Sequence, residues 1–317
     1  MREDLYFDSC GAGIIHACRW APEGAPKAIL QIVHGIAEYV ERYDNFAEYL
    51  TAQGYMVVAE DHMGHGKSIG KACVQGYFTG GWFSAVEDTC ELMRQTKAEY
   101  PDLPYVLFGH SMGSFMARTV LTQYPDVDVD AAVICGTGWL PQAMLQMGIS
   151  ACKLVCRLKG EKTPSETLQG IVFGSYNRRV EHPRTAYDWI NRDANCVDAY
   201  IADPLCGFTA SAGLLRDMMQ GILYIQQQKN LRKMRKDLPV LFIAGGDDPV
   251  GDYGSGVRKT AEVFENVGMT DISVRVYPLC RHEILNEINK EEIYMDVTKW
   301  LRLLEKRAQH TTELEIC

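Results

Sequence analysis

Residues 105–113 read YVLFGHSMG and carry more information than any other stretch of the chain. The apolar first half predicts a buried strand, and the residues that follow predict a helix from Ser114 to about Gln123. Between the two, Ser111 stands in a Gly-x-Ser-x-Gly turn, where a strained backbone lifts the hydroxyl above the sheet. Glycines flank Ser111 because a Cβ there would obstruct the neighbouring backbone. The stretch therefore predicts a nucleophilic serine at the end of a core strand.

Strands and helices alternate along most of the chain. Apolar, β-branched runs bounded by turn residues predict further strands at 28–33, 55–60, 131–135, 240–244 and 272–277. Helical spacing of apolar residues predicts helices at 42–53, 82–100, 255–266 and 290–306. This alternation is typical of an α/β fold with a doubly wound, mostly parallel sheet. Functional loops are then expected at the carboxyl ends of the strands.

The alternation is interrupted between about residues 139 and 237. This stretch has no strand of comparable quality, and it predicts helices at 142–158, 186–193 and 214–236. It contains 14 basic and 8 acidic residues between positions 140 and 236, so it carries +6; since the whole chain carries −9, the rest carries −15. We interpret 139–237 as a helical cap (a lid) inserted between core strands, and 1–138 together with 238–317 as the core.

Composition excludes several classes of protein. With 32 basic and 41 acidic residues, the net charge of −9 argues against nucleic-acid binding. No apolar run approaches the roughly 20 residues that span a bilayer, and the amino terminus lacks the basic and apolar regions of a secretory signal. The eleven cysteines include no Cys-x-x-Cys pair, so we expect neither a disulfide framework nor a zinc site, but free thiols in a reducing cytoplasm.

An attacking serine needs a general base that takes its proton and an acid that orients the base. In this kind of fold the order along the chain is serine, acid, histidine. Of the histidines after Ser111, His182 lies in the predicted cap and His310 in the terminal tail, whereas His282 directly follows a predicted core strand. His282 is therefore the expected base, and a structural loop histidine is the alternative.

The acid is expected after the preceding strand, in the run AGGDDP at 244–249. Asp247, Asp248 and Asp252 compete for this role, and the residues alone leave the choice open. Asp247 is equally suited to capping the next segment or to a solvated position.

An oxyanion hole needs backbone N–H groups aimed at the carbonyl oxygen on which charge develops. One is expected from Met112, the residue after the nucleophile, and the other from Ile36 in the loop after the first core strand. The run DHMGHGKS at 61–68 contains two histidines and an aspartate, but a single short loop supplies too few convergent ligands for a metal. We expect a structural loop in which His65 bonds to backbone, and we expect no metal and no cofactor.

Several motifs together resemble the monoacylglycerol lipase and lysophospholipase family of α/β-hydrolases. They follow one another along nearly the whole chain: HGIAE at 34–38, DHMGHGKS at 61–68, GHSMG at 109–113, DPL at 203–205, GDDPVG at 246–251 and RHEILNE at 281–287. The resemblance implies roles for five residues, with Ser111 as nucleophile, Asp248 as acid, His282 as base, and Ile36 and Met112 as oxyanion donors. One departure is Met63, where many relatives carry arginine, and it bears on the packing of that loop.

The resemblance implies a serine hydrolase that cleaves the ester of a single acyl chain, of the monoacylglycerol or lysophospholipid type, through an acyl-enzyme. Apolar cap residues are candidates for holding the acyl chain of this small lipid substrate: Met144, Met147, Met218 and Met219, with Leu145, Ile149, Leu154 and Val155. The alternative is that this stripe is ordinary core. The basic run KNLRKMRK at 229–236 favours either transient contact of the cap with an anionic membrane surface or a solvated helix face.

Other functions stay open. An amidase or aminopeptidase of the same fold would hold a substrate ammonium with acidic cap residues, for which the candidates are Glu166, Glu181, Asp188 and Asp193, although the cap is net basic. A short-chain esterase would have a small closed pocket in place of an acyl tunnel. A catalytically silent binding protein on this fold would typically lack a member of the triad, and the sequence contains all three.

Overall fold

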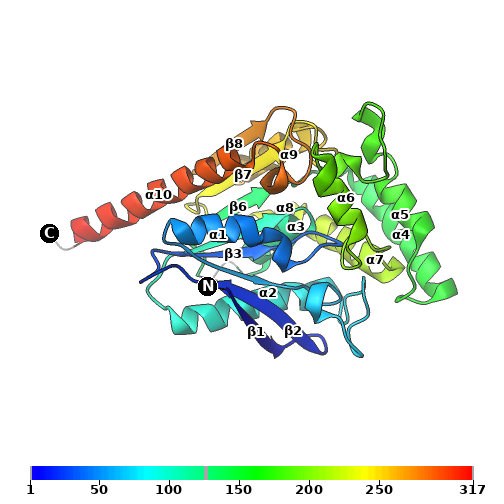
Figure 1. The fold of residues 1–317 in the computed structure, drawn as a ribbon, viewed down its shortest axis with the longest axis horizontal. Coiled ribbons are helices and arrows are strands. Elements are labelled where there is room, and N and C mark those ends of the chain that lie inside the picture. Colours follow the sequence, from blue (N-terminus) through cyan, green and yellow to red (C-terminus); the bar gives the residue numbers. More distant parts are fainter. Residues whose placement is uncertain (1, 125–127, 316–317) are drawn as a thin grey trace.

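The computed structural model describes residues 2–124 and 128–315. An eight-stranded sheet with the order β1–β2–β4–β3–β5–β6–β7–β8 runs through its centre (Figure 1). The strands span Arg2–Asp8 (β1), Ile14–Trp20 (β2), Ile29–Val33 (β3), Met56–Glu60 (β4), Tyr105–His110 (β5), Ala131–Cys135 (β6), Val240–Gly245 (β7) and Ile272–Tyr277 (β8). Only the pairings of β2, with β1 and with β4, are antiparallel among the described strands. The predicted α/β fold with a doubly wound, mostly parallel sheet is therefore confirmed.

The central strands match the predicted ones because each is a short apolar run that is buried on both faces. Their side chains alternate between two hydrophobic clusters: in β3, Ile29 and Val33 belong to one and Leu30 and Ile32 to the other. The hairpin of β1 and β2 was not predicted from the sequence. Its edge strand β1 is mostly exposed and charged, so it lacks the apolar run that marks a buried strand.

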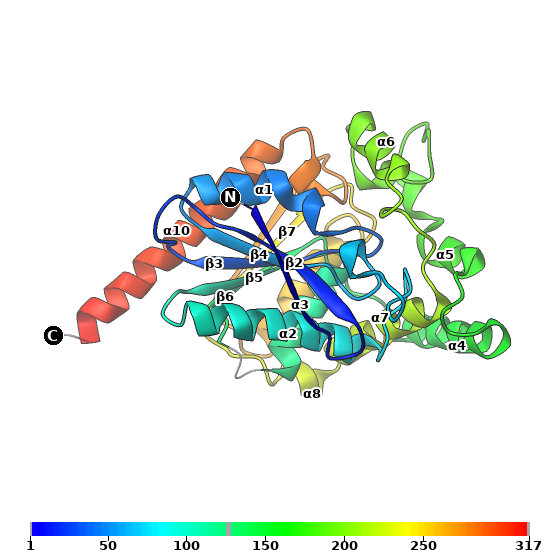
Figure 2. The same cartoon turned by 60° about the horizontal axis from the view of Figure 1, so that its bottom comes forward.

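Helices cover both faces of the sheet (Figures 1 and 2). On one face lie α1 (Asp44–Ala52) and α10 (Lys290–Glu315), whose buried side chains share a cluster with the strands. On the other face lie α2 (Trp82–Glu99), α3 (Met112–Gln123) and α9 (Ser255–Asn266). This cover on both sides explains why the parallel strands are apolar throughout.

Between β6 and β7 the chain forms a series of helices. These are α4 (Gln142–Lys159), α5 (Glu166–Phe173), α6 (Ala194–Ala202), α7 (Ala212–Ile225) and α8 (Gln228–Leu231). In Figure 2, α4, α5 and α6 lie beyond one end of the sheet, on the side away from the carboxyl terminus. The helical character predicted for this stretch is thus present.

Two predicted helices of this stretch are wrong in extent. Over 186–193 the structure has only a 3-10 turn at Asp188–Ile190. The helix begins after Asp193, because the carboxylate of Asp193 accepts a hydrogen bond from the N–H of Asn195 at 2.9 Å and so caps α6. The predicted helix at 214–236 is divided into α7 and the short α8, and α5 was not predicted.

Helix α7 packs on the core. Its Gly221 lies so close to Trp82 of α2 that an added Cβ would be 2.2 Å from the indole Cε2. Leu214 and Ile222 belong to the same cluster as α2 and α3. The division of the chain into a core and a cap at 139–237 stays a prediction.

The structure bears on two predictions from composition, the lack of a membrane-spanning segment and the free cysteines. No helix within residues 2–124 and 128–315 combines the length and the apolar character needed to cross a membrane. The ten cysteines of the described residues are free, as their spacing predicts. A cytoplasmic location stays a prediction.

Candidate active site

Ser111 lies at the turn between β5 and α3, as the sequence predicts. Its backbone has φ 54° and ψ −122°, a conformation that is strained for any residue with a Cβ. Gly109 and Gly113, two residues to either side of Ser111, have no room for a side chain. A Cβ added to Gly109 would lie 2.4 Å from the carbonyl oxygen of Gly113, and a Cβ added to Gly113 would lie 1.9 Å from the carbonyl oxygen of Val33. The close packing of α3 on β3 and β5 therefore imposes both the glycines and the strained serine.

Ser111, His282 and Asp248 form a continuous hydrogen-bonded chain. Oγ of Ser111 lies 2.8 Å from Nε2 of His282, and Nδ1 of His282 lies 3.0 Å from Oδ1 of Asp248. Asp248 follows β7 and His282 follows β8, so the carboxyl ends of two neighbouring strands bring them together. Both side chains are buried. A buried acid, a base and a hydroxyl at these distances can activate the hydroxyl as a nucleophile.

The structure separates the three competing aspartates. Asp247 is exposed, and Asp252 bonds within its own turn. Oδ1 of Asp248 also accepts a hydrogen bond from the N–H of Val250 at 2.9 Å. Its Oδ2 has no hydrogen-bond partner in the described part of the chain. The geometry therefore favours Asp248 as the partner of His282.

A buried ionic network lies behind the histidine. Oε1 of Glu38 accepts a hydrogen bond from the hydroxyl of Tyr43 at 2.9 Å and lies 3.1 Å from Nδ1 of His110. Oε2 of Glu38 lies 3.1 Å from Nη1 of Arg42. The guanidinium of Arg42 also binds both carboxylate oxygens of Glu283, at 2.5 and 2.7 Å. Bidentate bonds of this kind fix the orientation as well as the charge.

His110 links this network to the backbone of His282. Its Nε2 lies 3.3 Å from the carbonyl oxygen of His282, and the two rings are 4.8 Å apart. Burial by itself lowers the pKa of His110, but the hydrogen bond and charge of Glu38 outweigh it and raise the pKa. Burial by itself raises the pKa of Glu38. The hydrogen bond to His110 and the positive charges of His110 and Arg42 outweigh this effect, so the pKa of Glu38 lies well below its usual value. The cationic form of His110 is thus favoured, and its Nε2–H donates to the backbone carbonyl oxygen of His282.

The loop that carries Ile36 lies against Ser111. A Cβ added to Gly35 would be 3.0 Å from Cβ of Ser111. The N–H of Gly35 donates to Oε1 of Glu38 at 2.5 Å, which ties this loop to the ionic network. Met112 is the first residue of α3, so its N–H has no acceptor within its own helix. Both expected oxyanion donors therefore belong to backbone next to Ser111, and their role stays a prediction.

The same loop is held from the helical insertion. Ala37 has φ 54°, and its carbonyl oxygen accepts two hydrogen bonds. The N–H of Gly207 donates at 3.0 Å, and the hydroxyl of Tyr200 also donates at 3.0 Å. Residues more than 160 positions away along the chain thus hold the backbone next to Ile36.

The loop at 61–68 is structural, as expected. The N–H of His62 donates to Nε2 of His34 at 3.0 Å, and Nε2 of His62 lies 3.0 Å from the carbonyl oxygen of His34. Nδ1 of His65 lies 3.2 Å from the carbonyl oxygen of Met63, and burial lowers the pKa of His65 to about 3. Met63 is buried, and its Sδ accepts a hydrogen bond from the N–H of Thr79 at 2.9 Å. Met63 therefore packs this loop through both its buried side chain and this hydrogen bond.

The four methionines predicted to bind substrate lie in different surroundings. Met218 is buried in the main cluster, and Met219 packs beside Gly148, where an added Cβ would lie 2.4 Å from Sδ of Met219. Met144 and Met147 are 50% and 70% exposed on α4. Met218 is therefore an ordinary residue of the hydrophobic core. A shared role of all four methionines in binding the acyl chain stays a prediction.

A protein-family model described as serine aminopeptidase, S33 (Hydrolase_4) matches residues 24–289. The chain belongs to this family. The match includes the helical insertion together with Ser111, Asp248 and His282.

Several similar proteins are ester hydrolases by name. A monoacylglycerol lipase from Mycolicibacterium smegmatis is 27% identical over 284 residues, which cover 89% of this chain and 90% of that protein. A monoglyceride lipase from Mus musculus is 27% identical over 289 residues, covering 86% and 84%. The crystal structure of a thermostable carboxyl esterase from Bacillus coagulans in complex with glycerol has a TM-score of 0.86 and 27% identity, and covers 96% of this chain and 99% of that one. The chain is a carboxylic ester hydrolase with the α/β-hydrolase fold.

Proposed function

We propose that the protein is a serine hydrolase that cleaves esters of a single acyl chain, of the monoacylglycerol or lysophospholipid type, through an acyl-enzyme. The observation that carries this proposal is the chain of hydrogen bonds from Ser111 through His282 to Asp248, at 2.8 and 3.0 Å. The substrate class is supported by the relatives named monoacylglycerol and monoglyceride lipase.

In the proposed acylation step, Nε2 of His282 accepts the proton of Ser111 while Oγ forms a bond to the ester carbonyl carbon. The carbonyl π electrons move to the oxygen, and the N–H groups of Ile36 and Met112 stabilise the negative charge there. Collapse of the tetrahedral intermediate breaks the bond to the leaving alcohol, which takes the proton from His282. Asp248 accepts the Nδ1–H bond throughout, so it keeps the productive tautomer and stabilises the imidazolium.

Water repeats the sequence on the acyl-enzyme. His282 removes a proton from the water as its oxygen attacks the acyl carbon, and the same N–H groups stabilise the second tetrahedral intermediate. Oγ of Ser111 leaves with the proton that His282 returns. The fatty acid is released and the free serine is restored.

Amide hydrolysis is the second candidate, because the family description is that of an aminopeptidase. Such an enzyme needs free carboxylates for the substrate ammonium. In the structure Asp188 accepts hydrogen bonds from the backbone N–H groups of Arg184 and Thr185, and Asp193 caps α6 through the N–H of Asn195. Two of the four acidic candidates are therefore engaged in local structure, which favours the ester.

We also propose that the cap meets a lipid surface through the outer side of α4. Large apolar side chains there are exposed and recur at helical spacing, at Met144, Met147, Leu154 and Leu158. Exposed basic residues accompany them at Lys153, Arg157 and Lys159. An apolar stripe beside basic residues is typical of helices that lie in the interface of an anionic membrane.

The basic run at 229–236, the sequence candidate for membrane contact, lies elsewhere. Nη1 of its Arg235 donates to the carbonyl oxygen of Val129 at 2.9 Å, just before β6 begins. The run therefore lies near the amino ends of the strands, whereas α4 follows the carboxyl end of β6. The proposed contact uses α4 and leaves the basic run out.

Labelling with a fluorophosphonate probe tests the proposed mechanism. Ser111→Ala should lose labelling, and its kcat on a p-nitrophenyl ester should fall by about 10⁶-fold, because triad members act as a unit. Ser150→Ala, at an exposed serine of α4, is the matched control and should keep both. Full labelling of Ser111→Ala would place the nucleophile elsewhere.

A panel of monoacylglycerols, lysophospholipids and aminoacyl amides then tests the substrate class. Faster turnover of the amides than of the glycerides would replace the ester assignment with the aminopeptidase. For the membrane contact, Leu158→Glu, at an exposed residue of α4 outside the acyl-chain candidates, should reduce flotation with anionic vesicles and spare hydrolysis of a water-soluble ester. Phe83→Glu, at an exposed residue of α2, is the control and should float as the wild type does.

A further inference from the structure

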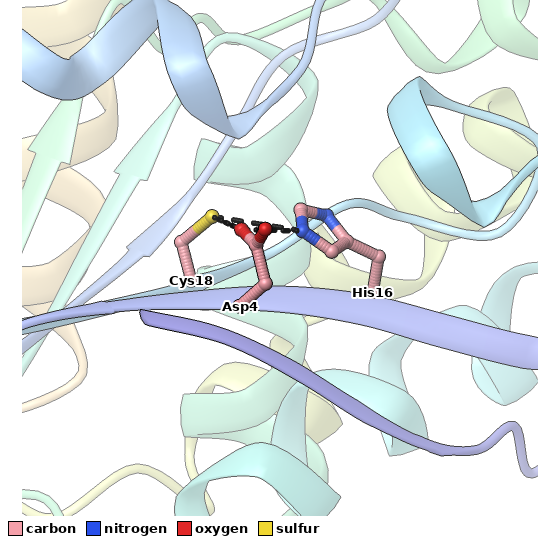
Figure 3. A group of neighbouring side chains, drawn as sticks. All are labelled: Asp4, His16 and Cys18. Atoms are coloured by element: carbon pink, nitrogen blue, oxygen red, sulfur yellow. Dashed lines mark hydrogen bonds and ion pairs between the residues drawn. The ribbon is translucent and has the colours of Figure 1, made fainter. Parts of the chain in front are cut away.

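Three metal-ligating side chains converge on the β1–β2 hairpin. The strand register places Asp4 directly opposite Cys18. His16 lies two residues before Cys18 on the same strand, so both project from one face of the hairpin together with Asp4. Figure 3 shows the carboxylate, the imidazole and the thiol turned toward one another above the two strands.

The distances between the three ligand atoms fit a tetrahedral zinc ion. Nε2 of His16 lies 3.2 Å from Oδ1 of Asp4. Sγ of Cys18 lies 3.4 Å from the same oxygen and 3.7 Å from the same nitrogen. Zinc bonds of about 2.0–2.1 Å to nitrogen and oxygen and about 2.3 Å to sulfur, at tetrahedral angles, separate the ligand atoms by roughly 3.3–3.6 Å. The side chains therefore occupy three corners of such a site with shifts of a few tenths of an ångström.

The other ring nitrogen of His16 is held as in metal-binding histidines. Nδ1 lies 2.7 Å from Oδ2 of Asp61, and both side chains are fully buried. A carboxylate that accepts Nδ1–H turns the ring and leaves the lone pair of Nε2 for a metal. Asp61 is itself fixed, because its carboxylate accepts the N–H groups of Val40 at 2.9 Å and of Lys67 at 2.8 Å.

Charge and access also suit a divalent cation. With a metal bound, the Cys18 thiolate and the Asp4 carboxylate would together carry −2 and balance the ion, and the His16 imidazole would be neutral. The side chain of Asp4 is 41% exposed while His16 and Cys18 are buried, so the ion reaches the site from the Asp4 side and a water can complete the fourth position. Nζ of Lys67 lies 3.7 Å from Oδ2 of Asp4, but Glu41 binds this ammonium at 2.9 Å and offsets its charge.

We propose that Asp4, His16 and Cys18 bind one Zn²⁺ ion, with water as the fourth ligand. On binding, the thiol of Cys18 gives its proton to solvent and its sulfur forms the Zn–S bond. Asp4 and Nε2 of His16 donate lone pairs, any proton between them also passes to solvent, and no group is oxidised or reduced. The ion links the edge strand β1 to β2, so it stabilises the amino-terminal hairpin independently of ester hydrolysis.

Cobalt provides a direct probe of the proposed site. The full-length protein is treated with a chelator, titrated with Co²⁺ and then with Zn²⁺ as competitor. We expect one Co²⁺ per chain, with a thiolate-to-cobalt charge-transfer band that Zn²⁺ removes. Cys18→Ser should abolish the band and weaken Zn²⁺ binding by more than about 100-fold, since changing even an outer partner of a metal site costs about 10–100-fold. Cys10→Ser, at an exposed cysteine of the same hairpin, should change neither.

Asp4→Asn guards against a variant that fails to fold, because Asp4 is exposed. The Asp4→Asn variant should keep the charge-transfer band at saturating Co²⁺ but bind Zn²⁺ more weakly. Zn²⁺ should therefore raise the Tm of this variant by less than it raises the Tm of the wild type. Cobalt bound without a charge-transfer band would overturn the proposal. So would Zn²⁺ affinities that are the same in the wild type, Cys18→Ser and Asp4→Asn, since the bound metal would then be an adventitious ion only.

Discussion

Arg42→Met should destabilise the protein strongly. Arg42 binds Glu283 at 2.5 and 2.7 Å and Glu38 at 3.1 Å. The three side chains are only 13%, 5% and 5% exposed. Methionine keeps much of the volume of the arginine stem but leaves two buried carboxylates without a cation. Removing one partner of a buried ion pair costs about 3–5 kcal/mol, so we expect a loss of that size in the free energy of unfolding.

Arg184→Met is the matched control. Nη2 of Arg184 lies 2.8 Å from Oδ1 of Asp198, and the two side chains are 50% and 57% exposed. An exposed pair of this kind contributes little to stability, because water solvates the partner that remains. The two arginines make contacts of similar length, so the difference between the variants measures the effect of burial.

Urea unfolding followed by circular dichroism at neutral pH measures both variants. The slope is about 1–3 kcal/mol per molar urea for small proteins and steeper for larger ones, so Arg42→Met should lower the midpoint by roughly 1 M, and Arg184→Met by much less. Adding Glu283→Gln to Arg42→Met should recover part of the loss, because one of the two unpaired charges is then removed. Equal, small losses in the two single variants would refute the argument from burial.

Three further predictions concern the site and its surroundings. Asp248→Asn should lower kcat on a p-nitrophenyl ester by about 10³–10⁴-fold, because the charge that stabilises the His282 imidazolium is lost; Asp247→Asn should leave kcat nearly unchanged, and equal losses would contradict the assignment of the acid. Burial raises the pKa of Glu60 to about 7 from its ordinary 4.5. The folded state then binds this proton more tightly than the unfolded state, so stability falls as the pH rises through that window. Glu60→Gln removes the titration, and its stability relative to the wild type should increase between pH 5 and pH 8 by an amount of order 3 kcal/mol in urea unfolding; a constant difference would argue against the buried acid. Finally, kcat/KM should rise from acetate towards medium-chain esters, by up to about 0.8 kcal/mol or fourfold for each buried methylene. A flat profile below the critical micelle concentration would instead indicate a short-chain esterase.

Local pattern was sufficient for the core of the fold. The central strands are short apolar runs because parallel strands with helices on both faces need apolar side chains on both. The motif predicts Ser111 as the nucleophile, and the order of the residues along the chain predicts His282 as the base. Spacing could not separate Asp248 from Asp247, because the two are neighbours in the chain. They differ in the structure, where the side chain of Asp248 turns inward after β7 and that of Asp247 is exposed.

Contacts between distant residues were beyond the reach of local pattern. Arg42 and Glu283 are 241 positions apart, so nothing near either residue indicates their ion pair. Asp4, His16 and Cys18 have no metal-ligand spacing of their own, and only the register of two unpredicted strands brings them together. In the insertion, the start of α6 depends on a single cap at Asp193, which apolar periodicity does not report.

The double anchoring of the Ala37 carbonyl has a consequence for protein engineering. Gly207 and Tyr200 both donate to it, so the helical insertion holds the backbone beside Ser111 in place. Deleting the insertion to obtain a minimal esterase would remove both hydrogen-bond donors to this carbonyl. Ala37, whose backbone is strained, would then lose the contacts that hold it in place. A chimaera that exchanges substrate-binding helices between relatives should therefore splice before α6, so that positions 200 and 207 stay with the parent scaffold.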